Sequence, residues 1–169
     1  MTILETERLV LRELTFADDA FVFELLNEPA YLRYIGDKNV RSPEDARNYL
    51  AIGPLASYAK HGFGLWRVAL KADDTPVGMC GLLKRDGMEH TDVGYALLTR
   101  HHGQGYACEA ATATLAHARN VLQLGTLQAV TAVENPASIG LLEKLGFRFD
   151  RMITMPGSAE PSRLFIRRI

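Results

Sequence analysis

Apolar and polar side chains alternate along the segment ERLVLREL at residues 7–14. A period of two predicts a β-strand with one buried face. Thr15 and Asp18 come next, three positions apart, which is typical of a capping box at the start of a helix. The apolar residues that follow recur at helical spacing, so an amphipathic helix is predicted over residues 16–27, ending before Pro29.

A second helix start follows at Ser42. Pro43 stands at its first helical position and acidic residues occupy its first turn, a combination that favours a helix N-terminus. This helix is predicted to run towards residue 60 with an interruption at Gly53-Pro54. Residues 31–40 show no clear period and are left without an assignment.

The second half of the chain begins with three strand-like segments separated by short turns, at residues 64–71, 76–84 and 90–99. Successive strands joined by tight turns predict an antiparallel meander. Helical spacing then predicts a helix at 106–122, and a Val- and Thr-rich segment predicts a strand at 127–133. Because a strand, helix and strand in succession place the two strands parallel, this part is expected to form a βαβ unit.

The last segments are a short helix and a hairpin. Asn135 is predicted to cap this helix, with Pro136 at its first position and Gly146 closing it. Residues 147–155 and 163–169 are expected to form the hairpin. The predicted fold class is therefore α+β, with a mixed sheet that is antiparallel at first and parallel in the middle.

Composition and charge restrict the functional class. The chain has 169 residues, of which 47% are hydrophobic and 23% charged, with a net charge of -1. This length predicts one domain over residues 1–169. The near-zero charge speaks against nucleic acid as the main partner. No apolar run could span a bilayer and no basic leader precedes one, so no membrane partner and a cytoplasmic location are expected.

The stretch HHGQGYACEA at residues 101–110 carries the first chemical signal. Its glycines lie at a strand-to-helix junction, where backbone can approach a phosphate closely. A P-loop is excluded because Tyr106 and Ala107, not lysine and a hydroxyl residue, follow Gly105. A dinucleotide fingerprint competes, although Cys108 stands where its third glycine belongs. Two other interpretations remain. One is a loop whose N–H groups bind the coenzyme A diphosphate, and the other is a turn without a ligand.

A second stretch, NPASIGLLEKLGF at residues 135–147, follows the next strand. The two stretches together resemble the GNAT superfamily of acyl-CoA-dependent N-acetyltransferases. The segments ETERLVLREL and VGYALLTRHHGQGYACEA resemble the branch that includes ribosomal-protein N-terminal acetyltransferases. The resemblance covers nearly the whole chain and implies a GNAT-like mixed sheet with helices on both faces. It also implies acetyl-CoA as co-substrate and no metal.

The resemblance assigns roles to individual residues. In the family, the strand before the loop splays from its parallel neighbour, and the pantetheine arm lies in the gap. A main-chain N–H near Leu98 is then the expected donor to the oxyanion. The cofactor-binding residues implied are Ala96, Leu97, Leu98, His102, Gly103, Gln104, Gly105, Tyr106, Ala107, Cys108, Asn135 and Ser138.

Two positions depart from the family pattern. The residue that opens the loop is usually Gln or Arg, and here it is either His102 or, in a shifted register, Arg100. Leu142 stands where many members carry a tyrosine thought to protonate the leaving thiolate. Ser138 lies one helical turn before Leu142 on the same helix face, so we expect its hydroxyl to be the catalytic acid. A capping-type bond to local backbone is the competing role for Ser138.

The general base has three candidates, Glu89, Asp92 and Glu109. Alternation places Asp92 on the same strand face as Gly94 and Ala96. A water chain could serve instead. His101-His102 could suggest a metal, but no further ligand follows at the right spacing.

The implied function is transfer of an acetyl group from acetyl-CoA to a primary amine, on a small molecule or a peptide. The alternative is a catalytically inactive GNAT-like module that binds CoA or a regulatory ligand. An oxidoreductase with a dinucleotide is a third reading, and a homodimer stays open. Aromatic residues could wall the acceptor pocket: Phe16, Phe21, Phe23, Tyr31, Tyr34 and Trp66.

Overall fold

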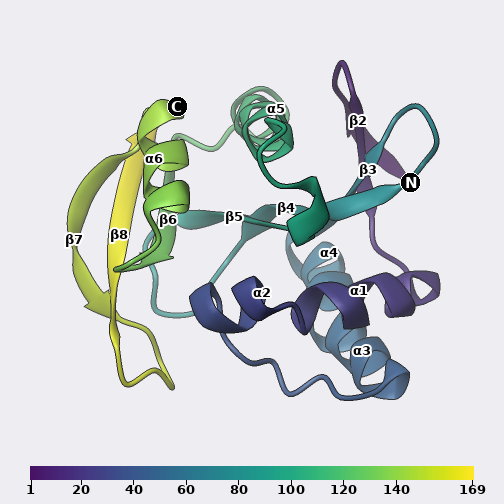
Figure 1. Cartoon of the computed structure of the whole chain (residues 1–169). Helices are drawn as coiled ribbons and strands as arrows, with labels where there is room; N and C mark the ends of the chain where they lie inside the picture. Colours follow the sequence, from purple (N-terminus) through teal and green to yellow (C-terminus); the bar gives the residue numbers. More distant parts are fainter.

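The computed structural model describes residues 1–169 and contains one sheet of eight strands in the order β1-β2-β3-β4-β5-β6-β8-β7 (Figure 1). The strands are β1 Thr2–Glu5, β2 Leu9–Glu13, β3 Leu65–Leu70, β4 Pro76–Leu83, β5 Thr91–Leu97, β6 Thr126–Ala132, β7 Arg148–Thr154 and β8 Pro161–Arg168. All neighbouring strands pair antiparallel except β5 and β6, which pair parallel. The predicted α+β class and mixed sheet are confirmed.

Helices cover both faces of the sheet, as predicted (Figure 1). They are α1 Asp19–Leu26, α2 Pro29–Tyr34, α3 Pro43–Leu50, α4 Ala56–His61, α5 Tyr106–Asn120 and α6 Pro136–Lys144. One buried core packs α5 and α6 on the sheet and includes Trp66, Leu115 and Leu142. A second core packs α1 and α3 on the other face and includes Leu25 and Leu50. None of the helices is long and apolar enough to cross a membrane.

The capping residues act as the sequence predicts. The Thr15 side chain accepts from the Ala17 N–H, and the Asp18 side chain accepts from the Thr15 N–H at 2.8 Å, which completes the capping box. Ser42 caps α3 by accepting from the Asp45 N–H at 3.1 Å. The predicted interruption is a π-helical turn at Ala51–Leu55, because Pro54 cannot donate a helical hydrogen bond.

Two elements were not predicted, β1 and α2. β1 has four residues, too few for alternation to be visible, and it pairs with β2 at the edge of the sheet. α2 begins at Pro29. From the sequence, this proline is predicted only to follow the end of the helix over residues 16–27. Proline is equally at home in the first turn of a new helix, so Pro29 both ends one helix and starts the next.

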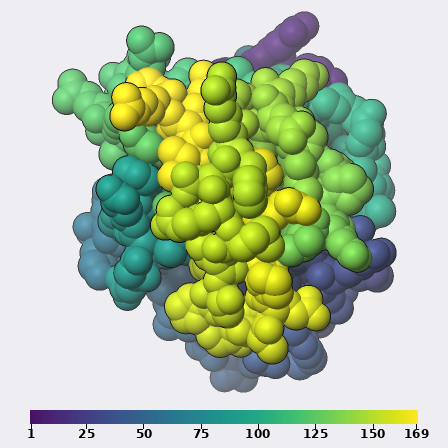
Figure 2. Space-filling model, turned by 90° about the vertical axis from the view of Figure 1, so that its left-hand side faces the viewer, coloured from purple at the N-terminus to yellow at the C-terminus, as the bar shows by residue number.

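The last two strands form the side of the molecule opposite β1. Figure 2 shows this side, where the C-terminal residues of β7 and β8 cover the surface. Phe149 and Met152 of β7 are exposed there. This part of the sheet joins the rest only through the pairing of β6 with β5.

Candidate active site

β5 and β6 separate after a short stretch of pairing. Their register includes only Thr91 with Leu127 and Asp92 with Gln128, although β5 continues to Leu97 and β6 to Ala132. A cavity of about 640 Å³ opens where the strands diverge. Both strands, the start of α5, α6 and α2 contribute to its walls. The splay that the resemblance implies is therefore present in this chain.

The main-chain groups of β5 point alternately towards β4 and towards this cavity. The Leu98 N–H donates to the Val77 carbonyl at 2.9 Å, and Leu98 is fully buried. Because an antiparallel strand bonds one neighbour with every second residue, Tyr95 and Leu97 direct their N–H groups away from β4. The expectation for Leu98 itself is therefore wrong, since its N–H is engaged by β4. Leu97 carries the N–H that faces the divergence.

The glycine stretch forms a loop that leads into α5. Gly103 and Gly105 have φ angles of 74° and 80°, which favour glycine. The first helical hydrogen bond runs from the Glu109 N–H to the Gly105 carbonyl at 3.0 Å. The six N–H groups of residues 103–108 have no acceptor within the protein. Such a row of donors at a helix N-terminus suits an anionic diphosphate.

A brace from the first hairpin holds this loop. Glu109 accepts from the Arg8 N–H at 2.8 Å, from Arg8 Nε at 2.7 Å and from the Thr6 hydroxyl at 2.5 Å. Arg8 Nη1 donates to the Gln104 carbonyl at 2.9 Å, and its guanidinium stacks on the Tyr106 ring. These hydrogen bonds lower the pKa of Glu109 against the effect of its partial burial. Glu109 thus anchors the loop from outside the cavity.

Most residues expected to bind the cofactor line the cavity. They are Ala96, Leu97, His102, Gly103, Gly105, Tyr106, Ala107, Cys108, Asn135 and Ser138. Leu98 and Gln104 do not, because Leu98 packs beneath β5 and Gln104 is exposed on the outer side of the loop. His102 Nε2 donates to the Leu97 carbonyl at 2.9 Å, which ties the loop to the end of β5. The Asn135 side chain caps α6 by accepting from the Ser138 N–H at 3.3 Å.

Ser138 has a partner that the sequence did not reveal. Its hydroxyl lies 2.8 Å from the Tyr95 hydroxyl, and both residues line the cavity beside Leu142. Burial raises the pKa of Tyr95 to about 12, so its phenol stays protonated at neutral pH. Tyr95 could have been found from alternation, which directs it to the face opposite Gly94 and Ala96. Thr131 of β6 is a second missed residue, which lines the cavity and has a buried hydroxyl without a partner.

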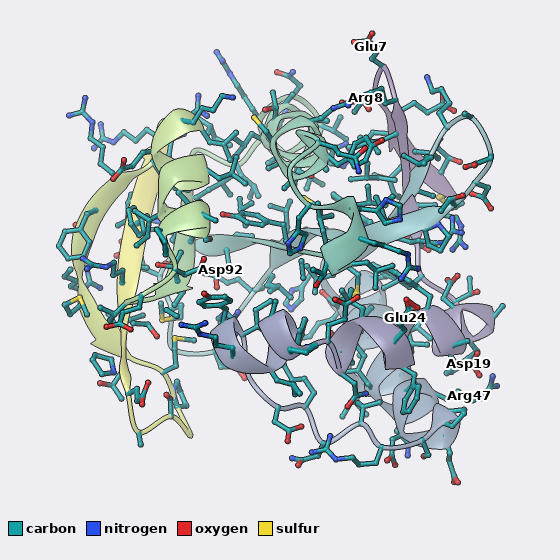
Figure 3. The ribbon with its side chains drawn as sticks, viewed as in Figure 1. Glu7, Arg8, Asp19, Glu24, Arg47 and Asp92 are labelled. Carbon is teal, nitrogen blue, oxygen red and sulfur yellow. The ribbon has the colours of Figure 1, made fainter.

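Only one of the three base candidates lines the cavity. Asp92 is 1% exposed and accepts hydrogen bonds from Arg85 and Gln128. Burial raises its pKa, which Arg85 and Gln128 partly oppose. Glu89 is exposed in the turn before β5, and Glu109 braces the loop. Figure 3 shows Asp92 between the C-terminal strands and α2, well away from Arg8.

The expected aromatic wall is only partly present. Tyr31 and Tyr34 line the cavity, and Tyr49 of α3, which was not considered, joins them. The remaining aromatic residues are absent from its walls: Phe16 is exposed, Phe21 and Phe23 pack around the core of α1 and α3, and Trp66 is buried beneath α5. A helical stripe of phenylalanines therefore serves packing here, while tyrosines from α2 and α3 reach the site.

Comparison with known proteins agrees with this geometry. The Acetyltransferase (GNAT) domain family matches residues 8–148. The chain is 33% identical over 156 residues to the uncharacterized protein YkkB of Bacillus subtilis, covering 90% of this chain and 88% of the relative. It is 29% identical to the uncharacterized N-acetyltransferase YoaA of the same organism, covering 86% of this chain and 82% of that one.

Solved structures share the whole fold. A GNAT-family acetyltransferase from Bacillus anthracis superposes with a TM-score of 0.81 at 26% identity, covering 99% of this chain and 98% of the other. The ribosomal L7/L12 α-N-protein acetyltransferase RimL, solved in complex with coenzyme A, has a TM-score of 0.81 at 17% identity, covering 100% and 98%. The latter likeness concerns the fold. With the family match spanning most of its length, this chain belongs to the GNAT acetyltransferase family.

Proposed function

We propose that this protein transfers the acetyl group of acetyl-CoA to a primary amine by direct attack. One observation carries the proposal: residues 103–108 at the start of α5 have six consecutive unpaired N–H groups, and all of these residues except Gln104 line the same cavity as the splayed edge of β5. The first feature suits a diphosphate and the second suits an extended, amide-containing arm. Acetyl-CoA contains both, and it supplies the activated acetyl thioester.

In this proposal, each part of the chain has one task. The loop at residues 103–108 binds the diphosphate, and the free edge of β5 at Tyr95 and Leu97 orients the arm. The Leu97 N–H, in place of Leu98, donates to the acetyl oxygen as negative charge develops there. Thr131 offers a further hydroxyl on the opposite wall.

The proton balance of the reaction involves two further groups. The nitrogen–carbon bond forms to give an oxyanion, from which the carbon–sulfur bond breaks, and the attacking nitrogen loses its proton to water in the cavity, which connects it to Asp92 at the other end of β5. The Ser138 hydroxyl donates a proton to the leaving sulfur and regains one from the Tyr95 hydroxyl that holds it, and water reprotonates Tyr95. Asp92 is suited to accept a proton because its pKa is raised, but its carboxylate is already engaged by Arg85 and Gln128. A water molecule bound near Asp92 could pass the proton on.

The test has a binding arm and a turnover arm. Thermal melting with acetyl-CoA, CoA and NADH measures which compound stabilises the fold, and release of the CoA thiol from acetyl-CoA is then followed with a panel of amines. Stabilisation by CoA with amine-dependent release supports the proposal. Stabilisation without release by any amine would instead establish an inactive CoA-binding module. Stabilisation by NADH alone would overturn the cofactor assignment.

A further inference from the structure

The end of the cavity nearest Asp92 is rich in positive charge. Two cationic side chains line it, Lys38 from the segment after α2 and Arg85 from the turn after β4. Asp92 is the only acidic residue among the residues that line the cavity. Its two oxygens are already used, one by Arg85 Nε and the other by Gln128 Nε2.

The two cations keep donors free for a ligand. Arg85 bonds Asp92 through Nε alone, and its two terminal nitrogens have no acceptor in the protein. Its side chain is 40% exposed, so these nitrogens are accessible. Lys38 makes no ion pair at 4.0 Å or less, and desolvation at the cavity wall together with the charge of Arg85 lowers its pKa, although the residue as a whole is exposed. Two cations close enough to repel each other, without a free carboxylate between them, form a site that an anion would stabilise.

The phenols around these cations add no negative charge. Tyr31 and Tyr49 line the same wall, and burial raises the pKa of both above its ordinary value. They therefore stay neutral and act as hydrogen-bond donors at any physiological pH. A carboxylate or phosphate bound here would meet guanidinium, ammonium and phenol donors, whereas an ammonium group would meet two cations against one carboxylate that is already engaged.

The position of the two cations along β5 indicates how far the anionic group of an acceptor must lie from its amine. Asp92 and Ala96 point to the same face of β5 and lie four residues apart, about 13 Å on a strand that rises ~3.3 Å per residue. Arg85 is held at the Asp92 end, while the transfer chemistry proposed above lies at the Leu97 end. An acceptor that reaches both ends must carry its anionic group several bonds away from its amine.

We propose that the acceptor is a primary amine bearing a carboxylate or phosphate several bonds from its nitrogen, and that Lys38 and Arg85 bind this anionic group. The inference rests on the proposed function and specifies its substrate class. Such an acceptor could be a small ω-amino acid or the N-terminus of an acidic peptide, which share this chemistry. Polyamines and aminoglycosides are excluded as good substrates.

The experiment compares acceptors that differ only in charge. CoA release is measured with ω-amino acids of increasing length and their amides, with ω-aminoalkyl phosphates, with short peptides containing Glu or Gln near the N-terminus, and with spermidine. We expect kcat/KM to be at least about tenfold higher for each charged member than for its neutral match. The preferred length among the ω-amino acids, and the ratio between these and the peptides, identify the source. Equal rates for charged and neutral members, or a preference for spermidine, would overturn the inference while leaving acetyl transfer intact.

Variants assign the effect to the two cations. Lys38→Gln should raise KM for the anionic acceptor about tenfold and leave KM for its amide within about twofold, and Arg85→Gln should raise KM for the anionic acceptor by a similar factor. Lys84→Gln is the matched control, because Lys84 is the exposed neighbour of Arg85 but does not line the cavity. Since Arg85→Gln leaves Asp92 without its ion-pair partner and could unfold, Lys38→Gln is the decisive variant. An unchanged anionic-to-neutral ratio in Lys38→Gln would contradict the role of Lys38.

A binding measurement tests the anionic site independently of the proposed acetyl transfer. If no amine releases CoA, the proposed function fails, and calorimetry with the N-acetylated ω-amino acid and its amide in the presence of CoA still tests the anionic site. Tighter binding of the carboxylate to the parent protein than to Lys38→Gln supports the site. Equal binding of carboxylate and amide to the parent protein removes it.

Discussion

At the scale of single residues, the Tyr95–Ser138 pair determines how the leaving sulfur could receive a proton. The two hydroxyl oxygens lie 2.8 Å apart, and the Ser138 carbonyl is a further acceptor for Tyr95 at 3.3 Å. Leu142 occupies the neighbouring part of the wall and cannot donate a proton. Tyr95 of β5 and Ser138 of α6 therefore supply the hydroxyl groups on this part of the cavity wall.

Removal of the Ser138 hydroxyl should slow the reaction without loosening the cofactor. A positioned acid contributes typically ~10²–10⁴ in rate, so we expect Ser138→Ala to lower kcat at least about tenfold with CoA affinity little changed. Tyr95→Phe should lower kcat by a smaller factor, because it removes the group that orients Ser138. Ser158→Ala, in the exposed turn between β7 and β8, is the control. Turnover of Ser138→Ala within about twofold of the parent would assign Ser138 to capping and packing alone.

The pH profile of kcat tests the same pair. With its pKa raised to about 12 by burial, the Tyr95 phenol loses its proton only well above the neutral range. Any alkaline limb between about pH 7 and 10 must then come from another group. We expect Tyr95→Phe to keep the position of that limb, and a shift of the limb in this variant would contradict the assignment.

The sequence pattern located this site to within one residue, but it did not identify the backbone N–H that faces the cavity. Alternation put Leu97 and Leu98 at the right place, yet the residue whose N–H faces the cavity depends on the register between β4 and β5. The hydrogen bond from the Leu98 N–H to the Val77 carbonyl belongs to this register. Contacts between strands far apart in the chain leave no local pattern in the sequence.

At the scale of elements, β4 holds the functional end of β5 through a glycine. A Cβ atom on Gly78 would lie 2.3 Å from the Ala96 carbonyl oxygen and 2.8 Å from Leu97 Cα. Both are backbone atoms of β5, at the end of the strand that lines the cavity. Gly78→Ala should therefore displace the end of β5, lower stability by about 1–3 kcal/mol as overpacking does, and weaken CoA binding.

Gly140→Ala is the matched control for this substitution. Gly140 lies in α6, exposed, with no atom within 4 Å of an added Cβ. Alanine is a better helix former than glycine by about 1 kcal/mol, so this variant should be neutral or more stable. Chemical denaturation and CoA titration of both variants provide the measurement. Normal CoA affinity in Gly78→Ala would show that β5 tolerates the displacement.

The α5 loop depends on a contact between elements that are distant in sequence. Arg8, from the turn before β2, braces Glu109 and the Gln104 carbonyl, as Figure 3 indicates by the position of Arg8 beside α5. We expect Arg8→Gln to weaken CoA binding by about three- to tenfold, since the phosphate-binding N–H groups lose their fixed arrangement. Arg41→Gln, which removes an exposed ion pair with Asp37, is the control. Equal CoA affinity in both variants would contradict the bracing role.

Acid should have the same effect as Arg8→Gln, at a pH set by Glu109. Its pKa is lowered in the folded protein, so the ionised form that pairs with Arg8 persists below the ordinary range of a glutamate. The contribution of the pair is present above that ordinary range and is lost as pH falls through the lowered pKa. CoA affinity of the parent should thus converge on that of Arg8→Gln only in strongly acidic solution.

The elements that the sequence predicted are the long or well-capped ones. Alternation over 7–14 and the caps at Ser42 and Asn135 identified β2, α3 and α6, because these signals lie within a few residues of one another. β1 and α2 have four and six residues, and tertiary contacts stabilise them: β1 pairs with β2, and the Tyr31 ring is buried in the core beside α1. The Arg8–Glu109 brace joins residues 101 positions apart, so no local signal could reveal it.

At the scale of the whole molecule, the sheet consists of two parts with a weak junction. Strands β1 to β5 form one part and β6, β8 and β7 the other, joined by two residue pairs, whereas β4 with β5 has six and β6 with β8 has seven. The cavity lies at this junction, so a bound cofactor would contact both parts. A ligand that binds only the native state stabilises it, by about 2.7 kcal/mol at a hundredfold excess over Kd. For a chain of this size, that corresponds to a rise of roughly 5–10 °C in Tm.

Hydrogen exchange can locate this stabilisation within the sheet. The Leu98 N–H already donates to β4 and should exchange slowly with or without CoA. The N–H groups of Tyr95 and Leu97 face the cavity, and we expect CoA to slow their exchange at least about tenfold, because the arm adds to the edge of β5 as a strand would. We therefore expect residue-resolved exchange, measured by NMR, to show CoA-dependent protection that alternates along β5. Uniform slowing along the strand would indicate general stabilisation instead, and no change at Leu97 would remove both the added-strand geometry and the oxyanion role of its N–H.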